Sequence, residues 1–361
     1  MKLEAAVING DGVGAEMMVP ALKALEAVCH IFGHKLCIYP VAACGETIES
    51  CGDPLPQESL KICQSVPAVL FGNTGLEKYR DLPLEKRPEA ALMGLRRGMK
   101  VTTNIRPVHS YPSLSAFSPM NKRILEKGLD FVFVRDIVGG ILCSDKVLTQ
   151  GSFGKEAYEY EYYNEKIVMD TARIAFELAD ARSGHITSLD KANVLESSRL
   201  WRQTIQKAAG QYGNINVEHC YIDNAAMKIL ESPNDFDVVV TSNLFGDIIS
   251  DEGTQMTGTA YLYASAEINK NHCGIYTLNQ LHYPDESVIG KQIVDPIGMI
   301  AAAALMLRFT FRLEQEAAVI EAAIAHTIDN GFATADIWEK GKILLSTSEM
   351  GEVIAERIKK S

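Results

Sequence analysis

The chain has 361 residues, of which 47% are apolar, and a formal net charge of −11. This length exceeds the roughly 250–300 residues that one hydrophobic core serves, so two domains are expected. The apolar content predicts a folded rather than a disordered chain. An acidic chain repels nucleic acid and anionic membrane surfaces, and we expect neither as a partner.

No segment has the pattern of a secretory signal or a membrane span. The most apolar stretch, Ile297–Leu307, is shorter than the roughly 20 residues of a spanning helix and ends at Arg308. The eight cysteines include no Cys-x-x-Cys pair, and a chain of this size needs no disulfide framework. We therefore expect a cytoplasmic protein with reduced, mostly buried thiols.

The predicted elements alternate between strand and helix. The chain opens with a strand over Glu4–Ile8, a glycine turn over 10–14 and a helix over Ala15–Phe32. Later apolar runs predict buried strands at Ala68–Phe71, Phe131–Val134, His185–Leu189, Val217–Ile222 and Asp237–Thr241. Residues 257–296 are expected to form loop, and the alanine-rich Ile297–Ile324 to be helical. This alternation predicts an α/β fold with largely parallel or mixed sheet.

The glycine turn does not match a dinucleotide-binding fingerprint. That motif requires Gly-x-Gly-x-x-Gly after a strand. Here the glycines are Gly10, Gly12 and Gly14, and position 15 is alanine. The spacing is at least as typical of a tight turn between a strand and a helix, so a Rossmann site is not predicted.

Three arginines are candidates for binding an anionic substrate. Arg96 lies in Gly-Leu-Arg-Arg, Arg106 lies in Asn-Ile-Arg-Pro, and Arg135 directly follows the apolar run Phe131–Val134. A guanidinium group holds a carboxylate by paired hydrogen bonds, so three such groups suit a dicarboxylate. Taken singly, each is more often an ordinary surface arginine.

Two aspartates and one lysine are further candidates. Asp247 and Asp251 are four residues apart, so a helix places both carboxylates on one face, where Mg²⁺ or Mn²⁺ relieves their repulsion. A solvated helix face is the alternative. Lys191 follows the predicted strand His185–Leu189 and can accept a proton if a metal-containing cleft lowers its pKa. A surface lysine is the commoner outcome for such a residue.

Longer stretches of the sequence match a known pattern. The three longest are Asp190–Leu195, Tyr221–Met227 and Asn243–Glu252; shorter ones include Asn9–Glu16, Gly52–Pro56, Asn104–Pro107, Gly139–Gly140, Leu200–Arg202 and Thr347–Gly351. In these stretches the chain resembles the isocitrate, 3-isopropylmalate, tartrate and D-malate dehydrogenases, which are β-decarboxylating 2-hydroxy-acid dehydrogenases. The similarity runs nearly end to end and points to a divergent member of the isopropylmalate branch.

The resemblance implies a two-domain α/β fold of the isopropylmalate dehydrogenase type, with mixed sheets flanked by helices, and not a Rossmann fold. The first, cofactor-side domain would comprise residues 1–103 and 258–361. The second, with the dimerisation and metal sites, would comprise residues 104–257. The family works as a homodimer, and each active site would be completed by Lys191 and Asp223 of the partner subunit.

The resemblance also implies the site residues. Those expected to hold Mg²⁺ or Mn²⁺ are Asp223, Asp247 and Asp251. Those expected to bind the malate carboxylates are Arg96, Arg106 and Arg135. Those expected to contact the cofactor, NAD or alternatively NADP, are Asn193, Asp285 and Asp295. Lys191, with Asp223 beside it, would accept the proton of the 2-hydroxyl, hydride would pass from C2 to the nicotinamide, and CO2 would leave.

Substrate choice is implied by the residues that precede Arg96. Glu89, Leu92 and Met93 match the Glu-x-x-Leu-Leu pattern of the isopropylmalate branch, in which the two apolar residues receive the alkyl group. The isocitrate branch has serine and asparagine there for a third carboxylate. The resemblance therefore implies a 3-alkylmalate-like substrate; the alternative is that Leu92 and Met93 belong to the core.

The chain departs from its relatives at two places that bear on the chemistry. Leu142 stands where relatives have the tyrosine that protonates the enolate carbon. In the cofactor loop, Thr277, Gln280 and Leu281 replace a glutamate, a histidine and a glycine. Asp285 is retained, and an acid there favours NAD because it repels the 2′-phosphate of NADP.

Three functions remain open. The leading one is NAD- and metal-dependent oxidation and decarboxylation of a 3-alkylmalate-like acid. The second is a tartrate- or D-malate-type dehydrogenase with an altered decarboxylation or protonation step, which Leu142 favours. The third is a non-catalytic regulatory subunit, against which the retained lysine, aspartates and arginines argue.

Overall fold

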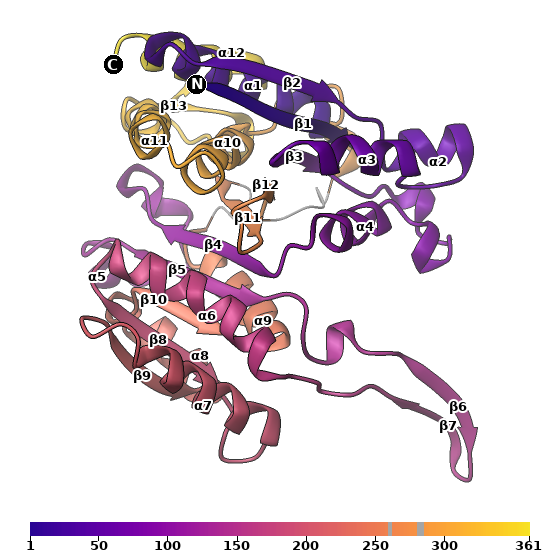
Figure 1. Ribbon diagram of the computed structural model, residues 1–361. Helices are drawn as coiled ribbons and strands as arrows, with labels where there is room; N and C mark the ends of the chain where they lie inside the picture. Colours follow the sequence, from indigo (N-terminus) through magenta and orange to yellow (C-terminus); the bar gives the residue numbers. More distant parts are fainter. Residues whose placement is uncertain (259–261, 280–284) are drawn as a thin grey trace. The chain divides into compact units, whose positions relative to one another are not determined.

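The computed structural model describes residues 1–258, 262–279 and 285–361. The chain divides into two compact units (Figure 1). The first unit contains Met1–Val101, Tyr111–Pro119 and Thr257–Ser361, and the second contains Thr102–Ser110 and Met120–Met256. The domain boundaries expected from the sequence stay a prediction; they would assign residues 111–119 to the second domain.

The first unit contributes five strands, which hydrogen-bond in the order β2-β1-β3-β12-β11. Their bounds are β1 Lys2–Gly10, β2 Lys35–Pro40, β3 Ala68–Asn73, β11 Ala264–Ile268 and β12 Gly274–Leu278. Neighbouring strands are parallel except β11, which is antiparallel to β12. Every residue of β3, β11 and β12 is buried, so this part of the sheet is the centre of the unit's core.

Helices cover the strands of the first unit. The bounds are α1 Gly14–Phe32, α2 Gly45–Cys51, α3 Gln57–Ser65, α4 Glu89–Met99, α10 Ile297–Phe309, α11 Glu314–Asp329 and α12 Thr347–Lys359. Helix α1 packs against α10 and α12, and α4 packs against α3 and β12. Nearly all of α10 is buried, as expected for a helix that is apolar all round. A short strand pair, β13 Phe332–Ala333 with β14 Ile343–Leu344, completes the unit.

The glycine turn between β1 and α1 is a tight turn, as the spacing allowed. Gly10 has φ 71° and Gly12 has φ 57°, a region of backbone conformation that favours glycine. A Cβ on Gly14 would lie 2.1 Å from the carbonyl oxygen of Asn9, so only glycine permits this approach.

One expectation about the C-terminal third was wrong and another is confirmed. Residues 257–296 are not only loop, because they contain β11 and β12. The two strands were missed because they are short and lie in a segment whose Tyr- and Asn-rich composition is typical of loop. The expectation that Ile297–Ile324 is helical is confirmed: the stretch forms two helices, since α10 ends at Phe309 and α11 begins at Glu314, with Arg312 between them at φ 58°.

The second unit contributes the strand order β4-β5-β10-β8-β9. Their bounds are β4 Thr103–His109, β5 Asp130–Asp136, β8 His185–Asp190, β9 Asn216–Tyr221 and β10 Val238–Thr241. Only β4 runs antiparallel to its neighbour. The helices are α5 Lys122–Leu125, α6 Glu165–Asp180, α7 Glu196–Ala209, α8 Ile222–Glu231 and α9 Asn243–Gln255. Helix α6 packs on α7, and α8 packs on α9.

Side-chain alternation along β5 decides which residues face α9. Phe131 and Phe133 belong to a buried cluster with Ile249 of α9 and Ile229 of α8. Because successive side chains of a strand point to opposite faces, Arg135 lies on this same face. Arg135, at the end of this apolar strand, therefore faces helix α9, which carries Asp247 and Asp251.

A two-stranded hairpin, β6 Val147–Gly151 with β7 Gly154–Tyr158, extends away from the helices of the second unit (Figure 1). Its side chains are mostly exposed, including large apolar ones: Leu148 is 70% and Phe153 is 99% exposed. Exposed apolar side chains on an isolated ribbon are typical of an interaction surface.

No helix within the described ranges is long and apolar enough to cross a membrane. The eight cysteines are free, and four of them, Cys29, Cys44, Cys63 and Cys220, are buried.

Candidate active site

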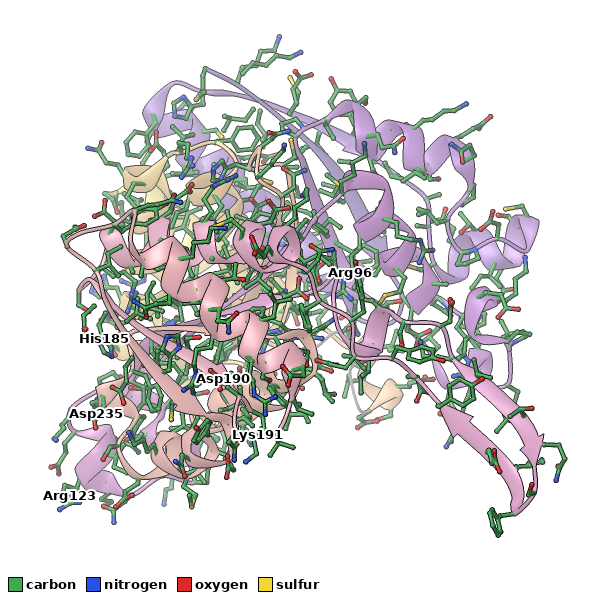
Figure 2. The ribbon with its side chains drawn as sticks, turned by 60° about the horizontal axis from the view of Figure 1, so that its bottom comes forward. Arg96, Arg123, His185, Asp190, Lys191 and Asp235 are labelled. Carbon is green, nitrogen blue, oxygen red and sulfur yellow. The ribbon has the colours of Figure 1, made fainter. Side chains whose placement is uncertain are left out.

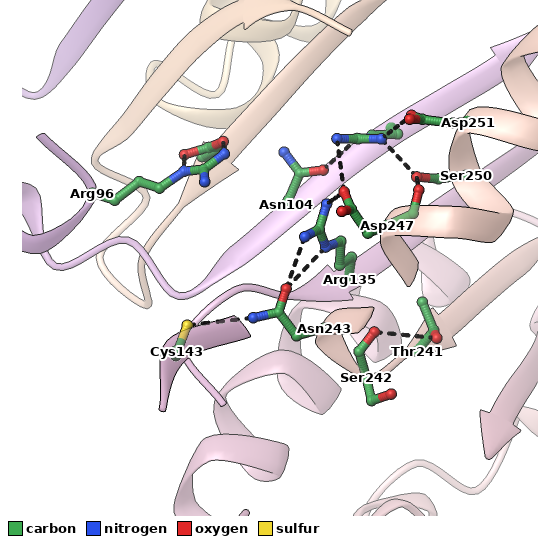
Figure 3. A network of polar contacts seen from close by, with 12 residues as sticks. Arg96, Asn104, Arg135, Cys143, Thr241, Ser242, Asn243, Asp247, Ser250 and Asp251 are labelled. Carbon is green, nitrogen blue, oxygen red and sulfur yellow. Dashed lines mark hydrogen bonds and ion pairs between the residues drawn. The ribbon is translucent and has the colours of Figure 1, made fainter. Parts of the chain in front are cut away.

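The register of β4 against β5 places two of the candidate arginines near each other. Asn104 of β4 pairs with Arg135 of β5, and Arg106 pairs with Phe133. Since Phe133 and Arg135 face α9, the even-numbered residues of β4 opposite them face it too. Figure 3 shows the polar network that results between these two strands and α9.

Arg135 is fixed by two residues of α9. Its Nη1 forms an ion pair with Asp247, and its Nη2 and Nε donate to Oδ1 of Asn243 at 2.8 and 3.2 Å. The guanidinium is largely buried, so its direction is set by these contacts rather than by solvent.

Arg106 is held in a similar way. Its Nη1 donates to Oδ1 of Asp251 at 2.6 Å and to Oγ of Ser250 at 2.7 Å, and its Nε donates to Asn104 at 2.9 Å. Its Nη2 lies 4.0 Å from Asp247. One helical turn of α9 thus holds two carboxylates against two guanidinium groups.

Asp247 and Asp251 lie on one face of α9, as the spacing predicted. The expectation that they are unpaired was wrong, because each has an arginine partner. The arginines offset the repulsion that the sequence argument assigned to a cation. The side chains of the two aspartates nevertheless remain 44% and 58% exposed, so both carboxylates have oxygen surface for a further ligand.

Asn243, which the sequence argument quoted only as part of a motif, connects this network to the loop after β5. Its side chain is buried and its Nδ2 donates to the carbonyl of Gly139 at 2.9 Å and to Sγ of Cys143 at 3.4 Å. Its own N–H donates to Oη of Tyr163 at 2.9 Å. A buried asparagine side chain needs hydrogen-bond partners of this kind. The position of Asn243 at the start of α9 is the sequence feature by which it could have been predicted as a site residue.

The loop after β5 is anchored by Asp136. Its carboxylate accepts the N–H of Gly139 at 2.7 Å and the hydroxyl of Tyr163 at 3.2 Å. Burial raises the pKa of Asp136 to about 6, although these hydrogen bonds oppose the rise. The loop leads into a short 3-10 helix, η4 Ile141–Cys143, on which Leu142 is partly exposed.

Lys191 directly follows Asp190, the last residue of β8 (Figure 2). It forms an ion pair with Asp223 at the start of α8. The distance from Nζ to Oδ1 is 2.6 Å, and this hydrogen bond is the main cause of the lowered pKa of Asp223. The preceding residue, Asp190, is buried and receives a bidentate contact from Arg202 at 2.8 and 2.9 Å. Arg202 lies in the matched stretch Leu200–Arg202, and the sequence alone predicted no role for it.

The three predicted metal ligands are not brought together. Within residues 1–258, 262–279 and 285–361, no three His, Cys, Asp or Glu side chains form a group that could hold a metal ion. Asp247 and Asp251 share one helix face, whereas Asp223 is paired with Lys191 on α8.

The remaining candidate arginine, Arg96, belongs to the first unit and has a carboxylate partner of its own chain. Its Nε donates to Oε2 of Glu267 at 2.7 Å, and its Nη2 bonds to the other carboxylate oxygen. Glu267 was not among the residues predicted from the sequence. It lies on β11, in the segment expected to be loop.

The residues expected to choose the substrate lie on α4. Leu92 is buried and belongs to the core, as the alternative reading allowed. Met93 is exposed, and its sulfur accepts a contact from Nη1 of Arg96 at 3.5 Å. Glu89, in the first turn of the helix, is partly exposed.

The cofactor candidates occupy different environments. Asn193 is exposed in the turn after β8, and Asp285 is exposed and caps a 3-10 turn by accepting the N–H of Ser287 at 2.8 Å. Asp295 is buried, and its carboxylate accepts the N–H of Ile297 at 2.7 Å. The substituted loop positions Gln280 and Leu281 lie outside the described residues.

Comparison with known proteins decides what family these features belong to. Residues 4–354 match the model of the isocitrate/isopropylmalate dehydrogenase family. The chain is 38% identical to the 3-isopropylmalate dehydrogenase of Helicobacter hepaticus, covering 99% of this chain and 100% of that one. It is 41% identical to the Haemophilus influenzae enzyme of the same name, covering 98% of each.

The chain belongs to the isocitrate/isopropylmalate dehydrogenase family. Among solved structures it is similar to isocitrate dehydrogenase from Methylococcus capsulatus, with a TM-score of 0.84, 25% identity and 99% of both chains covered. A β-decarboxylating dehydrogenase from Thermococcus kodakarensis gives a TM-score of 0.79 at 25% identity, covering 99% of this chain and 96% of that one.

Family membership confirms the predicted fold class, an isopropylmalate-dehydrogenase-like α/β fold with mixed sheets. The enzyme class is confirmed as well: the protein is an oxidoreductase that acts on a CH–OH group with decarboxylation. Position 142, at which the resemblance led us to look for a tyrosine, is a leucine, and its side chain has no proton to donate.

Proposed function

We propose that the protein oxidises and decarboxylates a 3-alkylmalate-like 2-hydroxy acid, of which 3-isopropylmalate is the first candidate, with NAD and a divalent cation. The observation that carries this proposal is the network of Arg106 and Arg135 with Asp247 and Asp251 on α9. This network places two guanidinium groups that can bind anions beside two carboxylates that can bind a cation.

In the proposed mechanism, the arginines exchange their aspartate partners for the carboxylates of the substrate. Substrate carboxylates would replace the Asp247 and Asp251 carboxylates on Arg135 and Arg106, and the two aspartates would be the residues that hold the cation. Each charge keeps a partner throughout, which matters because an uncompensated charge at a partly buried site is costly.

The donor set fits Mg²⁺ or Mn²⁺. Both cations prefer carboxylate oxygens, and the exposed surface of Asp247 and Asp251 supplies them from one helix face. Asp223 is the proposed third ligand and comes from the partner subunit. When bound, the cation supplies positive charge that lowers the pKa of the 2-hydroxyl and stabilises the enolate formed as CO2 leaves.

Lys191 is the proposed acceptor of the proton from the 2-hydroxyl, with Asp223 beside it. Nζ lies 2.6 Å from Oδ1 of Asp223. This pair holds the lysine as an ammonium, so Lys191 would have to release a proton before it can accept the one from the 2-hydroxyl. The bidentate contact of Arg202 to Asp190 holds the chain immediately before Lys191, so the lysine approaches the substrate from a fixed backbone.

NAD is the proposed hydride acceptor, and Asn193 would contact its nicotinamide end. The pKa of Asp285 is lowered by its hydrogen bonds to Ser287, so this exposed carboxylate stays ionised at neutral pH. An ionised carboxylate accepts ribose hydroxyls and repels a 2′-phosphate, which favours NAD over NADP. Asp295 is the third proposed contact, and it would have to be uncovered first because it is buried.

The last step, protonation of the enolate carbon, has no side-chain acid at position 142. This observation favours a second candidate, a tartrate- or D-malate-type dehydrogenase in which decarboxylation or protonation differs. Measuring CO2 released per nicotinamide reduced separates the first candidate, which releases one CO2 in each turnover, from a second candidate that keeps the oxo acid without decarboxylation.

A homodimer with shared active sites is part of the proposal. Within the described ranges one chain does not assemble the three metal ligands, and the hairpin β6–β7 carries exposed apolar side chains such as Phe153. A second copy would cover these and bring Lys191 and Asp223 to the neighbour's Asp247 and Asp251.

The direct test is nicotinamide reduction by the purified protein, followed by absorbance. The protein is supplied with Mn²⁺, NAD or NADP, and 3-isopropylmalate, D-malate, tartrate or isocitrate in turn. Asp247→Asn is expected to lower kcat/KM at least 100-fold, because it removes a cation ligand and the partner of Arg135. Asp130→Asn, which alters an exposed aspartate paired with Arg182, is the control and should leave the rate unchanged.

Reduction with 3-isopropylmalate and NAD, lost in Asp247→Asn only, supports the proposal. No reduction with any acid and either nucleotide, by protein that melts cooperatively, would overturn it. Faster turnover of D-malate or tartrate, with less than one CO2 for each nicotinamide reduced, would favour the second candidate.

A further inference from the structure

Helices α11 and α12 of the first unit pack on each other and border a hollow that the proposed function does not use. Its volume is about 400 Å³, a size that holds a small molecule. None of the side chains that line it is acidic, although the whole chain has a net charge of −11. The lining residues are Ala322, Ala323, His326, Arg357, Lys360 and Ser361. The hollow therefore gathers positive charge on a protein that is acidic as a whole.

Arg357 is held in place but has no anionic partner. Its Nη1 donates to Nδ1 of His326 at 2.9 Å, and its guanidinium lies over the ring of Phe332, with 5.7 Å between Cζ and the ring centroid. Its Nε is buried and has no hydrogen-bond partner within the part of the chain that the structure describes, which is rare in folded proteins. Arg96 and Arg308 of the same unit, by contrast, each pair with a carboxylate. Arg357 therefore has donors left for a ligand.

His326 adds an uncharged donor to the same hollow. A guanidinium group has no acceptor, so the Nδ1 atom that receives the bond from Arg357 carries no proton. The proton of the neutral imidazole is then on Nε2, which can donate to a ligand. Because Arg357 is on α12 and His326 is on α11, the bond between them also fixes the position of the two donors relative to each other.

Lys360 supplies the second positive charge. It is exposed and directly follows Lys359, the last residue of α12. Glu356, the acidic residue in the same turn of the helix, pairs with Lys359 at 2.7 Å. Cations at the carboxyl end of a helix also balance its dipole, and this effect is the simpler explanation for Lys360. The dipole does not explain why Lys360 and Arg357 line a hollow together with a histidine of another helix.

We propose that the hollow bordered by α11 and α12 binds the phosphate group of a small molecule. Two positive charges and one neutral donor match a phosphate group, which carries a charge of about −1.5 to −2 at pH 7 and three acceptor oxygens. The donors come from three side chains on two elements, so they suit a tetrahedral group better than a planar carboxylate, which one guanidinium satisfies. This inference does not depend on the proposed function, because none of these residues belongs to the proposed active site.

The probe is phenyl phosphate, a phosphate ester with an apolar ring, and the readout is the proton–nitrogen NMR spectrum of the histidine rings in the full chain. The variant His326→Gln identifies the signals of His326. Since this ring lines the hollow, its signals separate binding there from binding of the same anion to Arg106 or Arg135. We expect the His326 signals to shift saturably as phenyl phosphate is added, and the titration gives the dissociation constant.

Three variants test the assignment. Arg357→Gln should weaken the binding of phenyl phosphate about tenfold or more, because it removes the guanidinium group. Lys360→Gln changes an exposed residue and leaves the fold intact, and it should weaken binding about threefold. Arg80→Gln is the matched control, because it removes one positive charge of the same unit outside the hollow and should leave the affinity unchanged. Thermal melting establishes that each variant is folded.

Inorganic phosphate is the second probe and distinguishes the source of the phosphate group. Tighter binding of phenyl phosphate supports a phosphate ester, whose organic part packs on Ala322 and Ala323, whereas equal affinities support free phosphate. If the His326 signals move with neither probe, or if both Arg357→Gln and Lys360→Gln bind phenyl phosphate as tightly as the wild type does, the inference is wrong. The cations then only balance the carboxyl end of α12.

Discussion

The buried carboxyl of Asp295 carries the clearest pH dependence of any single residue. Oγ1 of Thr334 lies 2.8 Å from Oδ2 of Asp295 and 2.6 Å from Oδ1 of Asp336. One hydroxyl proton cannot serve both carboxylates fully, so the arrangement favours one protonated carboxyl. Burial, with the charge of Asp336 as second cause, raises the pKa of Asp295 to about 8.

This raised pKa predicts that the fold loses stability as the pH rises from about 4 to about 8. The native protein binds a proton that the unfolded chain, with an ordinary aspartate pKa near 4, releases. The stabilisation is therefore complete below about pH 4 and is lost as the pH rises towards 8, at up to about 1.4 kcal/mol per pH unit.

Asp295→Asn tests that prediction, because it removes the titrating group and keeps the acceptor for the N–H of Ile297. Urea unfolding at pH 6 and pH 8 should show a smaller loss of stability in the variant than in the wild type. Asp136 titrates lower, near 6, so it interferes little in this interval. Equal losses in the two proteins would mean that Asp295 is ionised throughout.

The ion pair of Arg96 and Glu267 predicts a second effect at the same scale. Arg96→Ala leaves a buried carboxylate without its partner, and breaking a buried pair on one side costs roughly 3–5 kcal/mol. Arg80→Ala breaks a pair whose side chains are both mostly exposed and should cost less than about 1 kcal/mol. Chemical denaturation measures both; similar values for the two variants would contradict the account.

At the scale of elements, α9 is the part on which the site depends. It follows β10 directly and packs on β5, and this close approach depends on Gly246. A Cβ at this position would lie 2.7 Å from Cγ of Arg135 and 2.7 Å from Cγ2 of Thr241. The helix therefore cannot carry even a methyl group here unless Arg135 moves.

We predict that Gly246→Ala raises KM for the acid substrate about tenfold or more, because it displaces Arg135 from its contacts with Asn243 and Asp247. Gly213→Ala is the control, since a Cβ there meets nothing within 4 Å. Steady-state kinetics provides the readout. An unchanged KM would show that the arginine can shift without losing the substrate.

The elements also show what the sequence could and could not predict. Arg135 was found because it ends an apolar strand, and Asp247 with Asp251 because the helical period brings residues four apart together. Glu267 was not predicted because its partner, Arg96, is 171 residues away in the sequence and because β11 carries polar side chains although it is buried. Pairings between distant segments are decided by tertiary packing, which local patterns do not contain.

At the scale of the whole molecule, the proposed homodimer predicts complementation between inactive subunits. Lys191→Met and Asp247→Asn should each abolish turnover. A heterodimer of these two, purified with two different tags, has one site with Lys191 from one subunit and Asp247 from the other. It should recover about half of the wild-type activity, because one of the two symmetric sites is intact.

The heterodimer of Asp247→Asn with Asp251→Asn is the control. Both substitutions affect the helix α9 of their own subunit, so every site carries a defect and the activity should stay near zero. If the first heterodimer is as inactive as its parents, the sites are not shared between subunits.

The central claim is that the chain itself performs an oxidation coupled to loss of CO2. The measurement that tests it most directly is the simultaneous recording of nicotinamide absorbance and CO2 release with 3-isopropylmalate, Mn²⁺ and NAD. We expect one CO2 for each NAD reduced, with both signals lost in Asp247→Asn. Reduction without CO2, or neither signal from folded protein with any of the four acids, would contradict it.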